Sequence, residues 1–242
     1  MQYQPIIPAI IPETYEQLSE RLGQLRQVVR RVQVDVMDGS YTQHSCWPYV
    51  GVNAGDFVGK ENQNESLPFH DTYDYEIDML LLHPEQHLHA WSLAGAMAVI
   101  VHVETVSDIE EILRSADKYR IELGVAIKPS TDIEMLAPYA QRASFFQCMG
   151  NDFVGESGMR LKETVYEKIR AIKKRWPNVS VGVDIGVNEE TLPALVAAGA
   201  ERFAVGSAVF GAGGDAPPAV LLLERLSGLQ EKTQKSIAEN EG

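Results

Sequence analysis

The 242-residue chain has only two cysteines, Cys46 and Cys148, and they form no regular pattern. A disulfide framework or a zinc knuckle needs more cysteines at characteristic spacings, so the sequence predicts neither. Two isolated thiols are typical of a reducing compartment. The N-terminus also shows no basic segment followed by an apolar core and a cleavage site, so no signal peptide is expected. The sequence therefore predicts a cytoplasmic protein.

Long apolar runs and clusters of positive charge are missing as well. No run is long enough to span a bilayer, so no membrane segment is expected. The formal net charge is −13, which argues against a nucleic-acid partner. The basic groups at residues 30–31 and 173–175 fall at predicted helix ends, where cations suit the helix dipole. A phosphorylated small molecule remains compatible with an acidic chain, because backbone N–H groups can bind phosphate locally.

Strand-like and helix-like segments alternate about eight times along the chain. This rhythm, roughly 30 residues per unit, is typical of a (β/α)₈ barrel of about 250 residues. A doubly wound open sheet alternates in the same way, so the pattern alone leaves both open. The predicted strands lie at 6–11, 32–36, 75–82, 96–103, 122–127, 144–149, 179–184 and 202–205. The predicted helices lie at 14–30, 84–94, 107–119 (with Ser107 as N-cap), 131–141, 161–176, 188–198 and 217–235.

No linker divides the chain, which predicts one domain over residues 1–242. Residues 40–70 form a long connection without a sustained period, and long loops of this kind are usually functional lids or mobile segments. His44, Cys46 and Trp47 are the side chains of this loop that would reach the mouth of a barrel. From about residue 230 the chain is a polar tail.

The stretch VQVDVMDG, residues 32–39, carries the first sign of function. Gln33 and Asp35 alternate with valines, which indicates a strand with two different faces. A carboxylate on a buried strand is costly unless it has a partner or faces a cavity. The C-terminal ends of the strands form the active site in parallel barrels. Polar side chains interrupt four later strands near those ends: Asp78, His102, Lys128 and Asp184.

Four of these side chains would bring oxygen atoms together at the mouth of a barrel, and they are Gln33, Asp35, Asp78 and Asp184. Hard cations such as Mg²⁺ or Mn²⁺ prefer such a set, whereas zinc favours nitrogen or sulfur ligands. The sequence thus predicts a divalent metal site. The structural alternative for the acids is an ion pair with a lysine such as Lys128. For His102 a core position with Glu104 as partner is favoured.

Two glycine-containing turns follow the last two predicted strands. In barrels, loops at these places and a short helix N-terminus frequently bind phosphate. Gly186, Gly206 and Ser207 are therefore candidate phosphate-binding residues. Lys128 is a candidate contact for an anionic substrate.

Seven segments, in order along nearly the full chain from the second strand on, resemble the ribulose-phosphate 3-epimerase family: VQVDVMDG, YEIDMLLLHPE, VHVET, GVAIKPST, FVGESG, VDIGVNEET and AVGSAVF. The first resembles the family's H-x-D-x-M-D-G motif, and the last its G-S-A-I/V-F motif. The resemblance implies a single (β/α)₈ TIM barrel of the ribulose-phosphate-binding type, which decides against the open sheet.

The resemblance also implies a function, namely epimerisation or isomerisation of a phosphorylated ketose in pentose phosphate metabolism. Asp35 and Asp184 match the two aspartates that remove and return a proton with the help of a divalent metal. Met37 matches a methionine that packs against the enediolate, and Gly155 belongs to the glycine-rich substrate loop. The family's members often form homo-oligomers, so a homo-oligomer is expected.

Several positions depart from the family pattern. Gln33 and Asp78 stand where the family has two metal-binding histidines, residues 8–12 read PAIIP in place of P-S-I-L-S, and Ile185 replaces a glycine. One interpretation is that the metal preference of the site has changed from an ion of borderline softness to Mg²⁺ or Mn²⁺. Another is a barrel that binds a phosphosugar-like ligand without turnover. A third is a different enolate reaction of the decarboxylase or aldolase type, for which Lys128 is the only candidate lysine.

Overall fold

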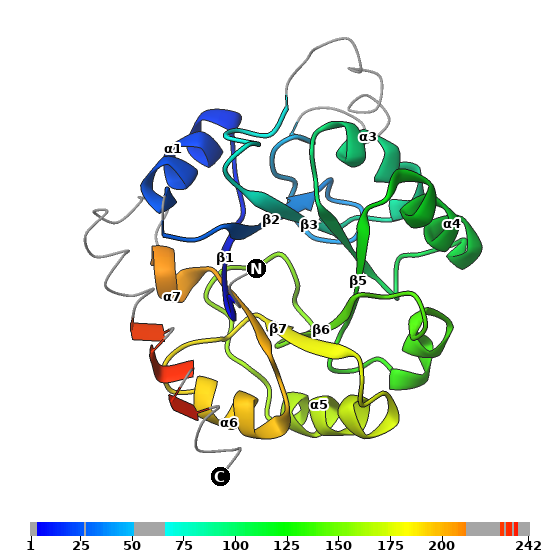
Figure 1. Cartoon of the computed structure of the whole chain (residues 1–242), viewed down its shortest axis with the longest axis vertical. Helices are drawn as coiled ribbons and strands as arrows, with labels where there is room; N and C mark the ends of the chain where they lie inside the picture. Colours follow the sequence, from blue (N-terminus) through cyan, green and yellow to red (C-terminus); the bar gives the residue numbers. More distant parts are fainter. Residues whose placement is uncertain are drawn as a thin grey trace.

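Eight parallel strands form a closed barrel in the computed structural model, in the order β1 to β8, with β8 pairing back to β1. The structure describes residues 4–26, 28–50, 66–211, 228–229, 231–233 and 235–236. Figure 1 shows the strands in the centre and the helices around them. The predicted TIM barrel is confirmed, and the open sheet is excluded. Most of the helix predicted at 217–235, most of the tail from about 230 and part of the long loop lie outside the described residues.

The elements follow the predicted order closely. The strands are β1 (Ile6–Ile10), β2 (Arg31–Met37), β3 (Asp74–Leu80), β4 (Ala98–His102), β5 (Glu122–Ile127), β6 (Phe145–Met149), β7 (Ser180–Asp184) and β8 (Arg202–Val205). The helices are α1 (Tyr15–Leu25), α3 (Leu88–Leu93), α4 (Ile109–Tyr119), α5 (Thr164–Arg175), α6 (Leu192–Ala198) and α7 (Ser207–Phe210), with the 3-10 helices η1 (Pro84–Gln86) and η2 (Ile133–Tyr139). None of the described helices has the length and apolar character needed to cross a membrane.

Three local predictions about helices are wrong. The helix predicted at 84–94 is divided into η1 and α3. The helix predicted at 131–141 is the 3-10 helix η2, with Pro138 inside it; proline lacks the N–H that an α-helix interior needs. Asp108 caps α4 in place of Ser107, because its Oδ1 accepts a hydrogen bond from the Glu111 N–H at 2.9 Å.

Alternation along the strands places one set of side chains outside the barrel, toward the helices, and the other set inside it. On β2, Val32, Val34 and Val36 are fully buried, and they face outward because side chains of a strand alternate between its two faces. On the opposite, inward face of the same strand, Gln33 and Asp35 are polar and Met37 at the strand end is apolar. At the N-terminal end of the barrel, the buried Glu76 Oε1 lies 2.5 Å from Arg202 Nη2 and 3.1 Å from Arg31 Nη1. This ion cluster closes the bottom of the barrel below the aspartates.

Replacement of Gly124 on β5 by alanine is expected to destabilise the protein. A Cβ at this position would lie 2.4 Å from the ring of Phe145, which is itself only 2% exposed inside the barrel. Overpacking of this kind costs about 1–3 kcal/mol. Thermal and urea unfolding would measure the change. Gly23→Ala on α1 is the control, because its Cβ would meet nothing within 4 Å and alanine favours the helix. Equal stability of Gly124→Ala and Gly23→Ala would contradict the packing described.

Candidate active site

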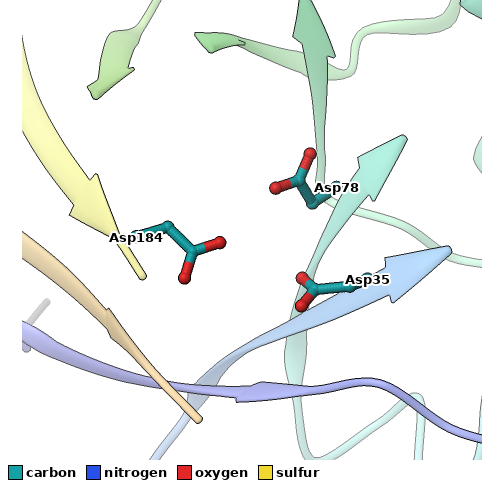
Figure 2. A group of neighbouring side chains, drawn as sticks. All are labelled: Asp35, Asp78 and Asp184. Atoms are coloured by element: carbon teal, nitrogen blue, oxygen red, sulfur yellow. The ribbon is translucent and has the colours of Figure 1, made fainter. Parts of the chain in front are cut away.

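The C-terminal ends of three strands bring three aspartates together at the mouth of the barrel. Asp35 on β2 and Asp78 on β3 are register partners on neighbouring strands, and Asp184 ends β7. Each carboxylate offers one oxygen, and these oxygens lie within 4.8 Å of one another. Figure 2 shows that Asp184 points toward Asp35 and Asp78 from the other side of the mouth. All three side chains are buried, at 6%, 0% and 8% exposure for Asp35, Asp78 and Asp184.

Amide groups and one imidazole hold the three carboxylates in place. Gln33 Nε2 donates to Asp35 Oδ1 at 2.7 Å and to Asp184 Oδ2 at 3.1 Å, so it bridges the two acids. Gln147 Nε2 on β6 donates to Asp78 Oδ2 at 3.1 Å. His102 Nε2 lies 3.0 Å from Asp78 Oδ1. Glu104, the expected partner of His102, lies at the other ring nitrogen, with its Oε2 4.0 Å from Nδ1, so the closer contact of His102 is the one with Asp78.

Burial and mutual repulsion raise the pKa values of two of these acids. Burial raises the pKa of Asp35 well above its usual range, and the charges of Asp184 and Asp78 raise it further. Burial and then the charge of Asp78 raise the pKa of Asp184 to about 7, although hydrogen bonds from Gln33 and the Ile185 N–H oppose the shift. Three neighbouring carboxylates cannot all be ionised without a compensating cation. At neutral pH the site therefore holds protons, a cation, or both.

The stability of the metal-free protein is expected to fall as the pH rises from about 4 to about 7. In the unfolded chain an aspartate ionises near pH 4, whereas the pKa of Asp184 in the folded protein is about 7. Between these values the folded protein binds more protons than the unfolded chain, so the free energy of unfolding decreases with pH. Melting temperatures in EDTA across this range would measure it, with Asp184→Asn as the comparison. An Asp184→Asn variant with the same pH dependence as the wild type would contradict the shift.

The site suits a divalent cation by its donor set. The side chains offer carboxylate oxygens from three aspartates, and Oε1 of Gln33 is a buried oxygen that accepts no hydrogen bond from the described residues. Oxygen donors are those that Mg²⁺ and Mn²⁺ prefer. The positions of O and N in an amide side chain can be exchanged by rotation, which would turn Oε1 of Gln33 toward Asp35 and Asp184. These residues could therefore hold a metal.

A cavity of about 270 Å³ adjoins the aspartates. Asp35 and Asp184 line it on one side, and the turns after β7 and β8 line it on another. Four of the residues predicted to bind substrate line this cavity, and they are Gly155, Gly186, Gly206 and Ser207. The cavity thus joins the acidic mouth of the barrel to the predicted phosphate turns.

The loops after β2 and β6 meet over the mouth. A Cβ at Gly155, where φ is +80°, would lie 2.5 Å from the sulfur of Met37. Met37 is buried directly beneath this loop, although it does not itself line the cavity. His44 Nε2 in the loop after β2 lies 3.3 Å from Glu156 Oε1 in the loop after β6. The predicted lid loop and the glycine-rich loop after β6 therefore contact each other.

Lys128 lies apart from the aspartates. Its Nζ is 4.0 Å from the centroid of the Tyr41 ring, and its backbone N–H donates to Glu104 Oε1 at 2.9 Å. Within the described ranges, no ion pair links Lys128 to Asp35 or to the other two aspartates. A role of Lys128 in substrate binding stays a prediction.

The turn after β7 keeps a glycine-like backbone although it contains isoleucine. Ile185 has a φ of +75° and Gly186 a φ of +77°. A left-handed conformation costs a β-branched residue about 1–2 kcal/mol. At Gly186 a Cβ would lie 2.4 Å from the Leu161 backbone nitrogen, so glycine is required there. Ile185 therefore adopts a backbone conformation at this turn that glycine would adopt without strain.

Two polar residues of the site were not identified from the sequence. Gln147 alternates with Phe145 and Met149 on β6, so its inward position follows from the strand period, but an amide among apolar residues gives no further signal. Arg21 lines the cavity from α1. A charged residue on a surface helix has the same sequence pattern whether it faces solvent or a neighbouring cavity, and only the packed barrel distinguishes the two.

Comparisons with known proteins agree with the sequence motifs. Residues 5–210 match the sequence model of the ribulose-phosphate 3 epimerase family. A ribulose-phosphate 3-epimerase of Schizosaccharomyces pombe is 25% identical over 232 residues, which cover 96% of this chain and 94% of the relative. The ribulose-phosphate 3-epimerase of Mycobacterium bovis is 29% identical over 194 residues, 75% of this chain and 82% of the relative.

Solved structures show the same architecture. A 3-hexulose-6-phosphate synthase matches with a TM-score of 0.61 at 20% identity, over 92% of this chain and 99% of that one. A tryptophan synthase alpha subunit from Pyrococcus furiosus matches with a TM-score of 0.66 at 16% identity, over 94% and 98%. At these identities the likeness concerns the barrel fold alone.

Proposed function

Because the chain belongs to the ribulose-phosphate 3-epimerase family, we propose that it interconverts D-ribulose 5-phosphate and D-xylulose 5-phosphate. The observation that carries the proposal is the pair of buried carboxylates, Asp35 and Asp184, that face each other across the mouth of the barrel (Figure 2). Inversion at C3 of the ketose needs one group to remove the proton and another to deliver a proton to the opposite face. Two carboxylates on different strands are suited to that arrangement.

The raised pKa values support a mechanism in which one of these aspartates acts as the base while the other acts as the acid. Asp184, with a pKa of about 7, can act as base when ionised and as acid when protonated near neutral pH. Repulsion between the two carboxylates favours a state in which one is protonated while the other is charged. Removal of the C3 proton by the charged acid leaves an enediolate, and donation from the protonated acid on the other face completes the inversion. The reverse reaction uses the same two groups with exchanged roles.

Asp35, Asp78 and Asp184, with Gln33, would hold a divalent cation in the proposed site. Such an ion would supply electrostatic stabilisation of the negative charge that develops on the ketose oxygens. Gln147 and His102 hold the carboxylate of Asp78 by hydrogen bonds at 3.1 and 3.0 Å, and such outer contacts orient the groups that bind a metal. We propose Mg²⁺ or Mn²⁺ rather than Zn²⁺, because all the donors are oxygen atoms.

Apolar side chains at the mouth would keep water away from the reaction. Met37, Leu80 and Met149 form a buried cluster next to the aspartates, and Gly155 allows the loop after β6 to approach Met37 closely. Exclusion of water strengthens the electrostatic interactions inside the site and protects a reactive enediolate. The phosphate of the substrate would lie against Gly186, Gly206 and Ser207, at the other side of the cavity.

The proposal is tested by NMR detection of D-xylulose 5-phosphate formed from D-ribulose 5-phosphate. The protein would first be treated with EDTA, and Mg²⁺, Mn²⁺ or Zn²⁺ would then be added separately at equal free concentration. We expect conversion with Mg²⁺ or Mn²⁺ and slower conversion with Zn²⁺. Absence of conversion with every ion would contradict the proposed reaction, and conversion with Zn²⁺ alone would contradict the proposed metal.

No specific observation favours the alternative functions. An aldolase or decarboxylase chemistry was linked to Lys128, whose Nζ lies over the Tyr41 ring and not among the aspartates. An ion pair of Lys128 with the aspartates would favour binding without turnover, but the described contacts of the mouth are those of Gln33, Gln147 and His102. A homo-oligomeric assembly and a cytoplasmic location stay predictions, the first testable by light scattering.

A further inference from the structure

The cavity beside the aspartates contains one basic side chain among its described lining residues. Arg21 on α1 is this residue. The acidic side chains of the lining outnumber it, and they are Glu13, Asp35, Glu156 and Asp184. A cavity that is acidic elsewhere repels anions, so its single guanidinium marks the place where an anionic group of a ligand would be stabilised.

Arg21 lies on the side of the cavity formed by α7. Its guanidinium carbon is 5.3 Å from the centroid of the Phe210 ring, and Phe210 is only 4% exposed. Phe210 ends the short helix that begins at Ser207, one of the predicted phosphate-binding residues. Figure 1 shows α1 and α7 as neighbours at the outside of the barrel. The guanidinium therefore lies beside the short helix that follows β8.

The packing of α1 explains why Arg21 faces the cavity. Leu18, Leu22 and Leu25 bury one face of the helix against the barrel. Gln17 and Arg21 are one turn apart, so they share a face, and both line the cavity. Burial lowers the pKa of Arg21, whereas the neighbouring carboxylates of Glu13 and Glu20 raise it. A guanidinium has five N–H donors, so contact with a neighbouring carboxylate still leaves donors for a ligand.

We propose that Arg21 binds the phosphate of the ketose phosphate. The guanidinium can donate two parallel hydrogen bonds to phosphate oxygens, and the backbone of the turns at Gly186 and Gly206 would contact the same group. Because the phosphate is then fixed at one side of the cavity, the ketose carbons extend toward Asp35 and Asp184. Arg21 thus determines specificity for phosphorylated over neutral ketoses. This inference rests on the proposed function, which it extends to recognition of the substrate's anionic end.

The test compares Arg21→Gln, Arg21→Lys and Arg21→Met with the wild type. Two readouts are used, the Kd for inorganic phosphate by calorimetry and the separate kcat and KM values for D-ribulose 5-phosphate. We expect Arg21→Gln to raise both Kd and KM by about 10- to 100-fold, the value of a charged hydrogen-bonded contact. The kcat should stay within about threefold, because a contact made equally in the ground and transition states affects KM alone.

Arg26→Gln is the matched control. It removes the same charge at the end of the same helix, where Arg26 lies over the ring of Phe69 at 4.4 Å and does not line the cavity described. Its Kd and KM should equal those of the wild type. Arg21→Lys keeps the charge without the paired donors and should show an intermediate KM. Arg21→Met keeps the apolar stem over Phe210 and replaces Arg21→Gln if that variant does not fold.

The outcomes separate this inference from the proposed function. Phosphate binding that depends on Arg21, in a protein that does not epimerise D-ribulose 5-phosphate, would support the role of Arg21 and contradict the proposed reaction. Epimerisation with an unchanged KM in Arg21→Gln or Arg21→Met would support the reaction and overturn the role of Arg21. A wild type that binds neither inorganic phosphate nor D-ribulose 5-phosphate would also overturn it.

Discussion

Replacement of Asp184 by asparagine is expected to lower kcat/KM for the interconversion of D-ribulose 5-phosphate and D-xylulose 5-phosphate by about 10²- to 10⁴-fold. Asparagine cannot accept or return the C3 proton, and it offers a weaker ligand to a cation. The fold should tolerate the change, because the Asn side-chain oxygen can still accept the hydrogen bond that the Ile185 N–H now donates to Asp184 Oδ1 at 2.7 Å. Steady-state kinetics with each epimer would measure the loss.

Asp71→Asn provides the control for this substitution. It makes the same chemical change at a side chain that is 90% exposed, and its kcat/KM should equal that of the wild type. Asp35→Asn should resemble Asp184→Asn, because both carboxylates are needed for inversion. An Asp184→Asn variant that retains more than about a tenth of the wild-type kcat/KM would contradict its role as acid and base.

Replacement of Glu76 by alanine is expected to reduce the free energy of unfolding by about 3–5 kcal/mol. Glu76 is fully buried in the lower part of the barrel and pairs with Arg31 and Arg202, whose side chains are 18% and 14% exposed. Without the carboxylate, two largely buried guanidinium groups would lose their common counter-charge. Removal of one partner from a buried ion pair is costly because it leaves the other charge uncompensated. Urea unfolding at constant pH would measure the difference.

Asp74→Ala is the comparison on the same strand. Asp74 pairs with Arg30 at 2.8 Å, and Arg30 is 67% exposed. Exposed pairs contribute little to stability, so Asp74→Ala should cost only a fraction of the Glu76→Ala change. Two variants of equal stability would show that the cluster at the bottom of the barrel does not have the energetic role described.

Strand periodicity was sufficient to predict much of the fold and of the acidic site. Alternation along the second strand placed Gln33 and Asp35 on the inward face, and the same reasoning placed Asp78 and Asp184 at strand ends. These four side chains do meet in the structure. These positions could be predicted because the C-terminal ends of all strands in a parallel barrel lie at the same end of the barrel.

Tertiary packing decided the features that the sequence did not reveal. His102 forms its hydrogen bond with Asp78 at 3.0 Å, closer than its 4.0 Å contact with the expected partner Glu104, because the register of neighbouring strands determines which side chains meet. Arg21 belongs to a helix whose polar residues show no sign of facing a cavity. Ser107 and Asp108 are both good caps, and the first turn of α4 selects Asp108 by geometry.

The most direct test of the two-carboxylate mechanism is exchange of the C3 hydrogen in D₂O, followed by NMR with each epimer as a separate substrate. The wild type is expected to introduce deuterium at C3 of both epimers while it interconverts them. Asp35→Asn and Asp184→Asn should each interconvert the epimers at least about 100-fold more slowly than the wild type. Each variant should still exchange the C3 hydrogen of one epimer only, and the two variants should act on opposite epimers. Asp35 and Asp184 lie on different sides of the mouth (Figure 2), so each remaining carboxylate is expected to reach only the face of C3 that lies toward it. A wild type that exchanges no C3 hydrogen with Mg²⁺, Mn²⁺ or Zn²⁺, or two variants that exchange the same epimer, would contradict the mechanism.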